Sequence, residues 1–181
     1  MRATDTAALV TCVAAALAAQ SFGTIHFPTS GSPKAQPHFL RGVAALHSFE
    51  YEEAADAFRQ AQAVDAGFAM AYWGEAMSQN RTLWSQEDRD AARRALARLG
   101  STPSARAARA PTPREQGYLG AVEILFDEGE KAARDLRYAE AMGRLAGRFP
   151  DDHEAAAFYA LAKLATVQRG IQGIATEGMH R

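Results

Sequence analysis

The chain has 181 residues, of which 48% are hydrophobic and 23% are charged, and its formal net charge at pH 7 is -1. This composition is that of a globular protein and excludes an intrinsically disordered chain. The near-zero net charge excludes the strongly basic surface on which general nucleic-acid binding depends, so no nucleic-acid partner is expected. The length fits a single domain or a short array of repeats.

The N-terminal residues have the features of an export signal. Arg2 supplies a positive charge, and residues 7–19 form an uncharged apolar run, which is shorter than the roughly 20 residues of a membrane-spanning helix. Ala16 and Ala18 give the small-residue pattern of a cleavage site. We therefore expect residues 1–19 to be a signal peptide and the protein to be periplasmic or extracellular, without stable membrane insertion. An ordinary N-terminal helix is the alternative.

The only cysteine, Cys12, lies inside this predicted signal. After cleavage the protein would contain no cysteine, which excludes disulfides, thiol catalysis and thiolate metal sites.

Residues 20–35 mix Gly, Pro, Ser and Thr without periodicity and are predicted to form an extended leader. Apolar residues then recur at helical spacing as far as residue 167. Helices are predicted from residue 36 to His47 and over 51–64, 68–79, 86–99, from 113 onward, over 131–148 and over 153–167. No strand pattern occurs, so the predicted fold is all-α, with about seven helices arranged as antiparallel pairs.

Caps and connectors support this division of the helical domain, 36–167. Ser85 with Asp88, and Thr112 with Pro113 and Glu115, resemble capping boxes at two helix starts. The segment between those helices, 100–113, is rich in Pro, Ala and Arg and is predicted to be a connector. The tail, 168–181, contains three glycines and is expected to fray.

A repeat search explains the helix pairs. A shift of 34 residues places His38 on Tyr72, Phe39 on Trp73 and Gly42 on Ala76. This period and the small residue at the helix crossing resemble the tetratricopeptide repeat (TPR) family, and in particular exported bacterial TPR proteins. The residues that carry the resemblance, and that it implies pack between paired helices, are Gly42, Tyr51, Ala54, Phe58, Ala61, Tyr72, Ala76 and Ala160.

The same resemblance implies a concave groove between the first helices of the repeats. Its matching positions are Phe39, Val43, His47, Met70, Trp73 and Met77. Some family members use Lys and Asn here to bind a C-terminal carboxylate, and those residue types are missing. An apolar groove instead fits a hydrophobic or amphipathic peptide segment. Burial within the core is the alternative role for these side chains, because Met and aromatic residues at helical spacing often pack in the core.

No pattern for catalysis, nucleotide binding or metal binding occurs. His38 and His47 fall on opposite faces of one helix, and His26, His153 and His180 are distant in sequence. We therefore expect a non-catalytic scaffold without a cofactor that binds another protein or peptide. The alternative is an extracytoplasmic small-molecule or metal carrier that uses Met70, Met77, His47 and Trp73.

Two surfaces are expected to remain available. The helix over 153–167 carries Phe158, Tyr159, Leu161 and Leu164 and lacks an obvious helical partner, so self-association through this C-terminal helix is one expectation. Several arginines form a basic edge that either binds an acidic partner or is simply solvated. They are Arg89, Arg93, Arg94 and Arg98, extended by Arg106, Arg109 and Arg114.

Overall fold

The computed structural model describes residues 25–179, with side chains described as far as Val167. The predicted signal peptide, 1–19, and the first part of the leader, 20–24, lie outside the described residues. Within the described part the fold is all-α, as predicted. Its helices are α1 (Gln36–His47), α2 (Tyr51–Val64), α3 (Ala69–Met77), α4 (Arg89–Leu99), α5 (Pro103–Ala107), α6 (Pro113–Leu125), α7 (Lys131–Arg148) and α8 (His153–Met179).

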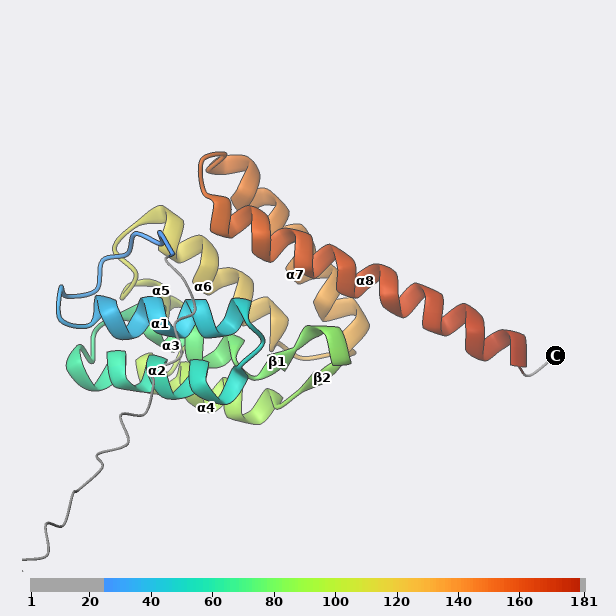
Figure 1. The fold of residues 1–181 in the computed structure, drawn as a ribbon, viewed down its shortest axis with the longest axis horizontal. Helices are drawn as coiled ribbons and strands as arrows, with labels where there is room; N and C mark the ends of the chain where they lie inside the picture. The colour runs from blue at the N-terminus through green and yellow to red at the C-terminus, as the bar shows by residue number, and fades with distance from the viewer. Residues whose placement is uncertain (1–24, 180–181) are drawn as a thin grey trace, which may run out of the picture.

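The helices form stacked pairs of consecutive elements (Figure 1), which makes the fold solenoid-like. Helix α1 packs on α2, α3 on α4, and α6 on α7, while α8 packs along α7. The first helices of successive pairs also meet, since α3 contacts both α1 and α6. Helices α1, α3, α6 and α7 each pack against two or more other helices. The buried side chains of the described residues join into one continuous hydrophobic core.

One aromatic ring joins the first two helix pairs. A Cβ atom added to Gly42 of α1 would lie 2.8 Å from the ring of Phe58, and one added to Gly74 of α3 would lie 2.3 Å from the same ring. Phe58 is itself fully buried. Two glycines therefore create the space that this phenylalanine fills between α1 and α3. The sequence predicted this role for Gly42 but not for Gly74.

The other predicted packing residues are buried in the first two helix pairs but not in α8. Those of the first two pairs are buried, namely Tyr51, Ala54, Ala61, Tyr72 and Ala76. The prediction for Ala160 is wrong, because Ala160 is exposed. The buried face of α8 is set by Ala155, Phe158, Ala162 and Ala165. Since successive helical residues are about 100° apart, Ala160 lies on the opposite side of the helix from Phe158.

Three local features differ from the predictions. Two short strands, β1 (Asn80–Arg81) and β2 (Gln86–Glu87), form an antiparallel hairpin around the 3-10 turn η1 (Thr82–Trp84). Helix α4 is capped by Asp88, whose carboxylate accepts from the Ala91 amide at 2.8 Å, and not by Ser85. Ser85 instead adopts a left-handed conformation in the hairpin. The 100–113 connector contains the short helix α5.

The C-terminal tail is helical and not frayed, since α8 continues to Met179 and projects past the helix pairs (Figure 1). No proline follows Pro150, so every later residue retains the amide hydrogen that helix propagation needs. The glycine penalty, about 1 kcal/mol per residue, does not end the helix. No helix in the described part of the chain is long and apolar enough to cross a membrane.

Candidate functional site

The residues predicted to line an open groove are mostly inside the protein. Phe39, Val43 and Met70 are 0% exposed, and Trp73 is 1% exposed. Met77 is also buried, and the hydroxyl of Tyr138 donates to its sulfur at 3.8 Å. The prediction of an open groove is therefore wrong for these five side chains. The reason is that other parts of the same chain cover the face that α1, α3 and α6 share.

Aromatic rings from distant segments provide that cover. Phe27, which precedes α1, has its ring centroid 5.3 Å from Phe39, 5.7 Å from Trp73 and 5.1 Å from Tyr118 of α6. Phe158 of α8 lies 5.3 Å from Trp73 on another side. These centroid distances are those of favourable edge-to-face and tilted aromatic pairs. The groove exists as a set of apolar walls, but it is occupied.

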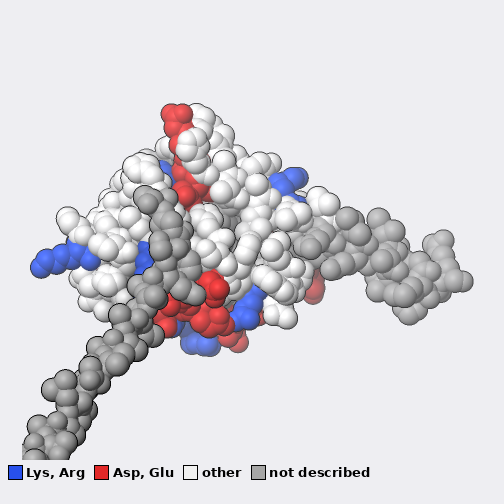
Figure 2. Space-filling view, viewed as in Figure 1, with Lys and Arg blue, Asp and Glu red and all other residues white. Residues whose placement is uncertain are grey.

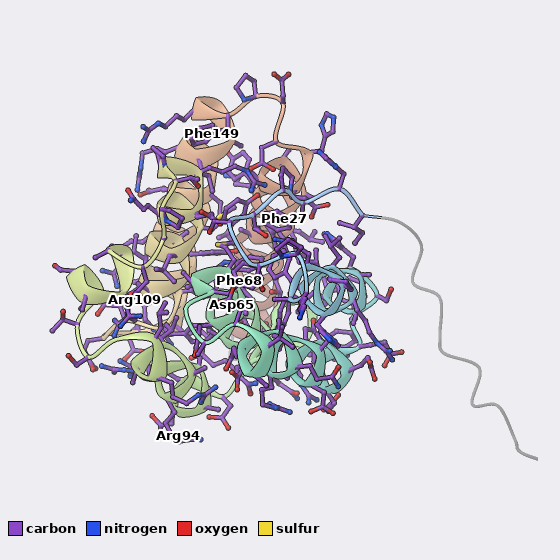
Figure 3. The ribbon with its side chains drawn as sticks, turned by 90° about the vertical axis from the view of Figure 1, so that its left-hand side faces the viewer. Phe27, Asp65, Phe68, Arg94, Arg109 and Phe149 are labelled. Atoms are coloured by element: carbon purple, nitrogen blue, oxygen red, sulfur yellow. The ribbon has the colours of Figure 1, made fainter. Side chains whose placement is uncertain are left out.

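One occupant is the non-helical segment 25–31, hereafter the plug segment. Phe27 is 2% exposed, and Figure 3 shows it among the helices and not on the outer edge of the molecule. The segment enters no helix and pairs with no strand. It is held by one inserted ring and by side chains of the surrounding helices, which is how globular domains commonly bind a peptide.

Arg114, near the N-terminus of α6, binds the plug segment through its guanidinium group. Its Nη1 donates to the Pro28 carbonyl at 2.8 Å, and its Cζ lies 4.5 Å from the centroid of the Phe27 ring. The guanidinium also forms a bidentate pair with Asp152, at 2.6 and 2.9 Å. Tyr118 donates its hydroxyl to the same carboxylate at 2.9 Å. A fixed cation is thus placed over the ring and beside the backbone of the plug.

The pKa values of Asp152 and Tyr118 are both shifted further away from neutral pH. Burial alone would raise the pKa of Asp152, but hydrogen bonds from Arg114, the Ala155 amide and Tyr118 hold it below the ordinary 3.8. Burial, together with the Asp152 carboxylate, raises the pKa of Tyr118. Asp152 is therefore a charged partner of Arg114 at neutral pH. The arrangement suits binding and positioning, since neither group is poised to exchange protons near pH 7.

Glu115 binds the plug segment beside Arg114. One carboxylate oxygen, Oε1, accepts from the Ser30 amide at 2.7 Å and from the Ser30 hydroxyl at 2.8 Å. The other oxygen accepts from the hydroxyl of Thr112 at 2.9 Å, and the Thr112 hydroxyl accepts from the Glu115 amide at 3.1 Å. The capping pair at this helix start is confirmed, but the acid has a second role. It holds the backbone of a segment 85 residues earlier in the chain.

His47 is the one predicted groove residue that remains accessible, with 35% of its side chain exposed. Its Nε2 lies 2.6 Å from a Glu154 carboxylate oxygen on α8, and its ring lies 5.4 Å from Phe158. This contact joins the end of α1 to α8. Met70 and Met77 are sealed in the core, and the described residues contain no group of three or more His, Cys, Asp or Glu that could hold a metal ion. Met70 and Met77 therefore do not line an open pocket together with His47.

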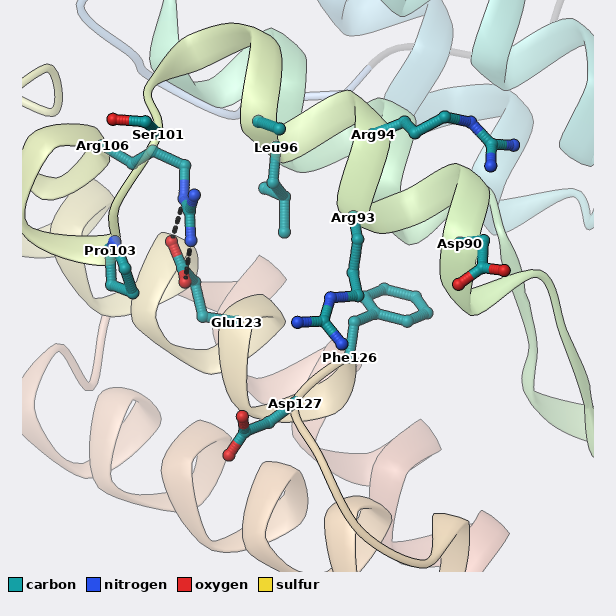
Figure 4. A pocket seen from close by; sticks show the side chains of 11 residues that line it. Asp90, Arg93, Arg94, Leu96, Ser101, Pro103, Arg106, Glu123, Phe126 and Asp127 are labelled. Atoms are coloured by element: carbon teal, nitrogen blue, oxygen red, sulfur yellow. Dashed lines mark hydrogen bonds and ion pairs between the residues drawn. The ribbon is translucent and has the colours of Figure 1, made fainter.

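The predicted basic edge is largely paired with acidic side chains. Arg89 and Arg93 bind Glu128, and Arg98 binds the buried Glu75. Arg106 forms a bidentate pair with Glu123, at 2.5 Å for each contact, in the wall of a cavity of about 560 Å³ (Figure 4). That cavity carries acidic and basic side chains together. Its walls therefore present no continuous positive surface for an acidic partner.

An exposed aromatic pair lies on the outer surface of the described part of the chain. Figure 2 shows a face that is mostly uncharged where it is described, with acidic and basic side chains together at its lower edge and acidic side chains at its top. Trp84 is 55% exposed and Phe49 is 39% exposed, and their ring centroids are 6.0 Å apart. Both lie outside the plug segment and its pocket.

The sequence pattern does not predict the burial of the plug segment or its contacts with Arg114 and Glu115. The lack of periodicity around Phe27 predicts only an extended leader, and the spacing of the arginines places Arg114 on the basic edge. A usable signal was present, since Ile25 and Phe27 are large apolar residues in an otherwise small and polar stretch that is followed by a strong turn sequence.

A comparison with known proteins finds no family model, no curated protein and no solved structure that matches this chain.

Proposed function

We propose that this protein is a non-catalytic interaction scaffold of the TPR type, which binds a hydrophobic or amphipathic peptide segment of another protein in the groove formed by α1, α3 and α6. One observation supports the proposal above the others: the groove already holds a non-helical segment of its own chain through an inserted phenylalanine. Apolar walls with a few convergent polar groups are typical of a binding site. The cluster of Arg114, Asp152 and Tyr118 is arranged to position a ligand.

A peptide display experiment on the full-length chain tests this function. The variant Phe27→Ala vacates the ring pocket, and Phe49→Ala is its matched control, because it removes the same ring from an exposed site. We expect peptides with an aromatic or large apolar anchor to be enriched on Phe27→Ala and not on Phe49→Ala. If no peptide distinguishes the two folded variants, the groove does not bind peptides and the proposal is wrong.

Self-association is a separate part of the proposal. Helix α8 exposes Leu164 by 49% and Val167 by 56%, and pairing of this face between two copies would hide both side chains. Light scattering during size-exclusion chromatography over a range of concentrations tests it. A mass that rises toward that of a dimer, and falls again in Leu164→Glu, supports pairing, whereas a constant monomer mass contradicts it.

Export also belongs to the proposal, on the basis of residues 1–19 alone. N-terminal sequencing of the protein recovered from its native cells tests it directly. A mature chain that begins after Ala18 or Ala19 supports export, whereas an intact N-terminus on cytoplasmic protein contradicts it.

A further inference from the structure

We propose that the ligand of this groove is a non-helical segment with the sequence Phe-Pro-x-Ser-Gly in a partner protein, and that residues 27–31 are the chain's own copy of that ligand, which the partner displaces. The inference rests on the proposed function and names its ligand class. Phe27, Pro28, Ser30 and Gly31 each meet a constraint from the helices or from Phe68. Position x is Thr29, whose hydroxyl lies 3.0 and 2.8 Å from the side-chain amide atoms of Gln36.

The first position requires an aromatic ring. Phe27 is in contact with three aromatic walls that come from α1, α3 and α6. Arg114 lies above the same ring. An aliphatic side chain would lose both the edge-to-face contacts and the cation-π contact.

The next positions are recognised mainly through the backbone. The Pro28 carbonyl accepts from Arg114, and proline at this position fixes φ near its usual value of about -65°. At the fourth position Glu115 accepts two hydrogen bonds, one from the amide and one from the hydroxyl of Ser30. Only Ser or Thr supplies both donors. Because Glu115 is 1% exposed, a ligand without the hydroxyl leaves part of a buried carboxylate unsatisfied.

The fifth position must be glycine. A Cβ atom added to Gly31 would lie 2.5–2.6 Å from three atoms of the Phe68 ring. Phe68 is 2% exposed and its ring centroid is 5.1 Å from that of Phe39, so it has little room to move. Beyond Gly31, the Ser32 amide donates to Asp65 at 2.8 Å. This contact marks the point at which the plug segment joins the turn before α1.

The plug segment is suited to exchange because side chains, and not a backbone ladder, hold it. On the α1 side, the Gln36 amide nitrogen donates to the carbonyl oxygens of Thr29 and Gly31 at 3.1 and 3.0 Å and to the Thr29 hydroxyl at 2.8 Å. The plug segment shares no backbone ladder with the rest of the protein, and its polar contacts with α6 involve only Arg114 and Glu115. A tethered segment of this kind has an effective concentration of roughly millimolar. A partner segment must therefore bind more tightly than the plug, or the plug must first be weakened.

Binding of a synthetic peptide of residues 25–33 tests the inference. The probe is a fluorescent version of that peptide, and the protein is the full chain carrying Phe27→Ala and Ser30→Ala, which remove the inserted ring and the serine hydroxyl of the plug. We expect this variant to bind the peptide at least tenfold more tightly than wild type, since the competitor in cis is weakened. Phe49→Ala is the control and should behave as wild type.

Altered peptides test each position on the same variant. Alanine in place of the peptide's serine should weaken binding about tenfold to a hundredfold, as expected for lost hydrogen bonds to a charged group. Alanine in place of the glycine or of the phenylalanine should abolish binding. Equal binding of all four peptides would overturn the proposed sequence while leaving a less selective peptide-binding function in place.

A second measurement covers the case in which the double variant does not fold. In wild-type protein, excess peptide should accelerate hydrogen exchange at the Ser30 amide, because displacement frees it from Glu115. No change in exchange at saturating peptide would show that the plug is a permanent part of the core and would overturn the inference. A wild-type dimer that the peptide dissociates would assign the site to a second copy of this chain instead of a different partner.

Discussion

Substitution of Gly74 by alanine tests the packing of the first two helix pairs. The new Cβ would lie 2.3 Å from the Phe58 ring, whereas carbon atoms in contact are about 3.5–4.0 Å apart. The ring cannot retreat toward α1, because a Cβ on Gly42 would also meet it at 2.8 Å, so that side is already filled. The substitution must therefore move a helix or force the ring out of its preferred rotamer.

The expected magnitude follows from two opposing terms. Alanine stabilises a helix interior relative to glycine by about 1 kcal/mol, whereas overpacking a core costs about 1–3 kcal/mol and occasionally more. The short distance and the closed opposite side place Gly74→Ala at the upper end of that range. We expect the free energy of unfolding to fall by about 2 kcal/mol. For a chain of this size, that loss lowers the melting temperature by roughly 4–8 °C.

Thermal and urea unfolding followed by far-UV circular dichroism measure this effect. Gly120→Ala is the matched control, since Gly120 is also in the interior of a helix but a Cβ there meets nothing within 4 Å. Gly120→Ala should raise the free energy of unfolding by up to about 1 kcal/mol. Shortening the ring with Phe58→Leu should relieve the clash, so that the double variant is at least about 1 kcal/mol more stable than additivity predicts. A Gly74→Ala protein as stable as Gly120→Ala would refute the reasoning.

Three further outcomes are expected. Trp73→Ala should lower the free energy of unfolding by about 3–5 kcal/mol because the indole is fully buried. Trp84→Ala should change it by less than about 0.5 kcal/mol. Equal losses for the two variants in urea titrations would contradict the placement of Trp73 in the core and Trp84 on the surface. Because the pKa of Asp152 is lowered in the folded state from 3.8, its contribution to stability is fully present above that pH and is lost as the pH falls through the folded value. Asp152→Asn should therefore have a lower melting temperature at neutral pH and a shallower decline on acidification, and an unchanged pH profile would show that the pair with Arg114 is unimportant. Glu115→Ala should leave the Ser30 amide without its partner and lower the free energy of unfolding by about 1–3 kcal/mol. It should also make the plug segment the first site of limited proteolysis. A plug segment as resistant to protease as in wild type would indicate that Glu115 is not needed to hold it.

Local periodicity predicted most of the helices because each helix carries its own signal. The predicted bounds of the second helix and of the helix over 131–148 match those of α2 and α7. The cap formed by Thr112 was also readable, since it depends on residues three positions apart. Such features are determined by neighbours in sequence, so one sequence is enough to find them.

The candidate site could not be predicted in the same way, because its parts come from separate regions. The pocket of Phe27 takes its walls from three helices, and Glu115 meets Ser30 across 85 residues. No period links these positions, and the same sequence pattern that places Trp73 on an open groove also places it in a core. Burial was decided by the plug segment and by Phe158, whose positions depend on the packing of the whole chain.

The contacts that join the start of the chain to α6 and α8 also have a consequence for how the chain acquires its structure. In an open solenoid each repeat contacts only its neighbours, so folding can start anywhere and spread along the array. Here Phe27 and Ser30 need α6, and His47 needs Glu154, which is 107 residues later. During synthesis the apolar faces of α1 and α3 therefore stay uncovered until α6 and then α8 have emerged, and closure must overcome the entropy of long loops. The chain should fold late and as one unit, with a period of exposure to aggregation that a strictly linear array would avoid.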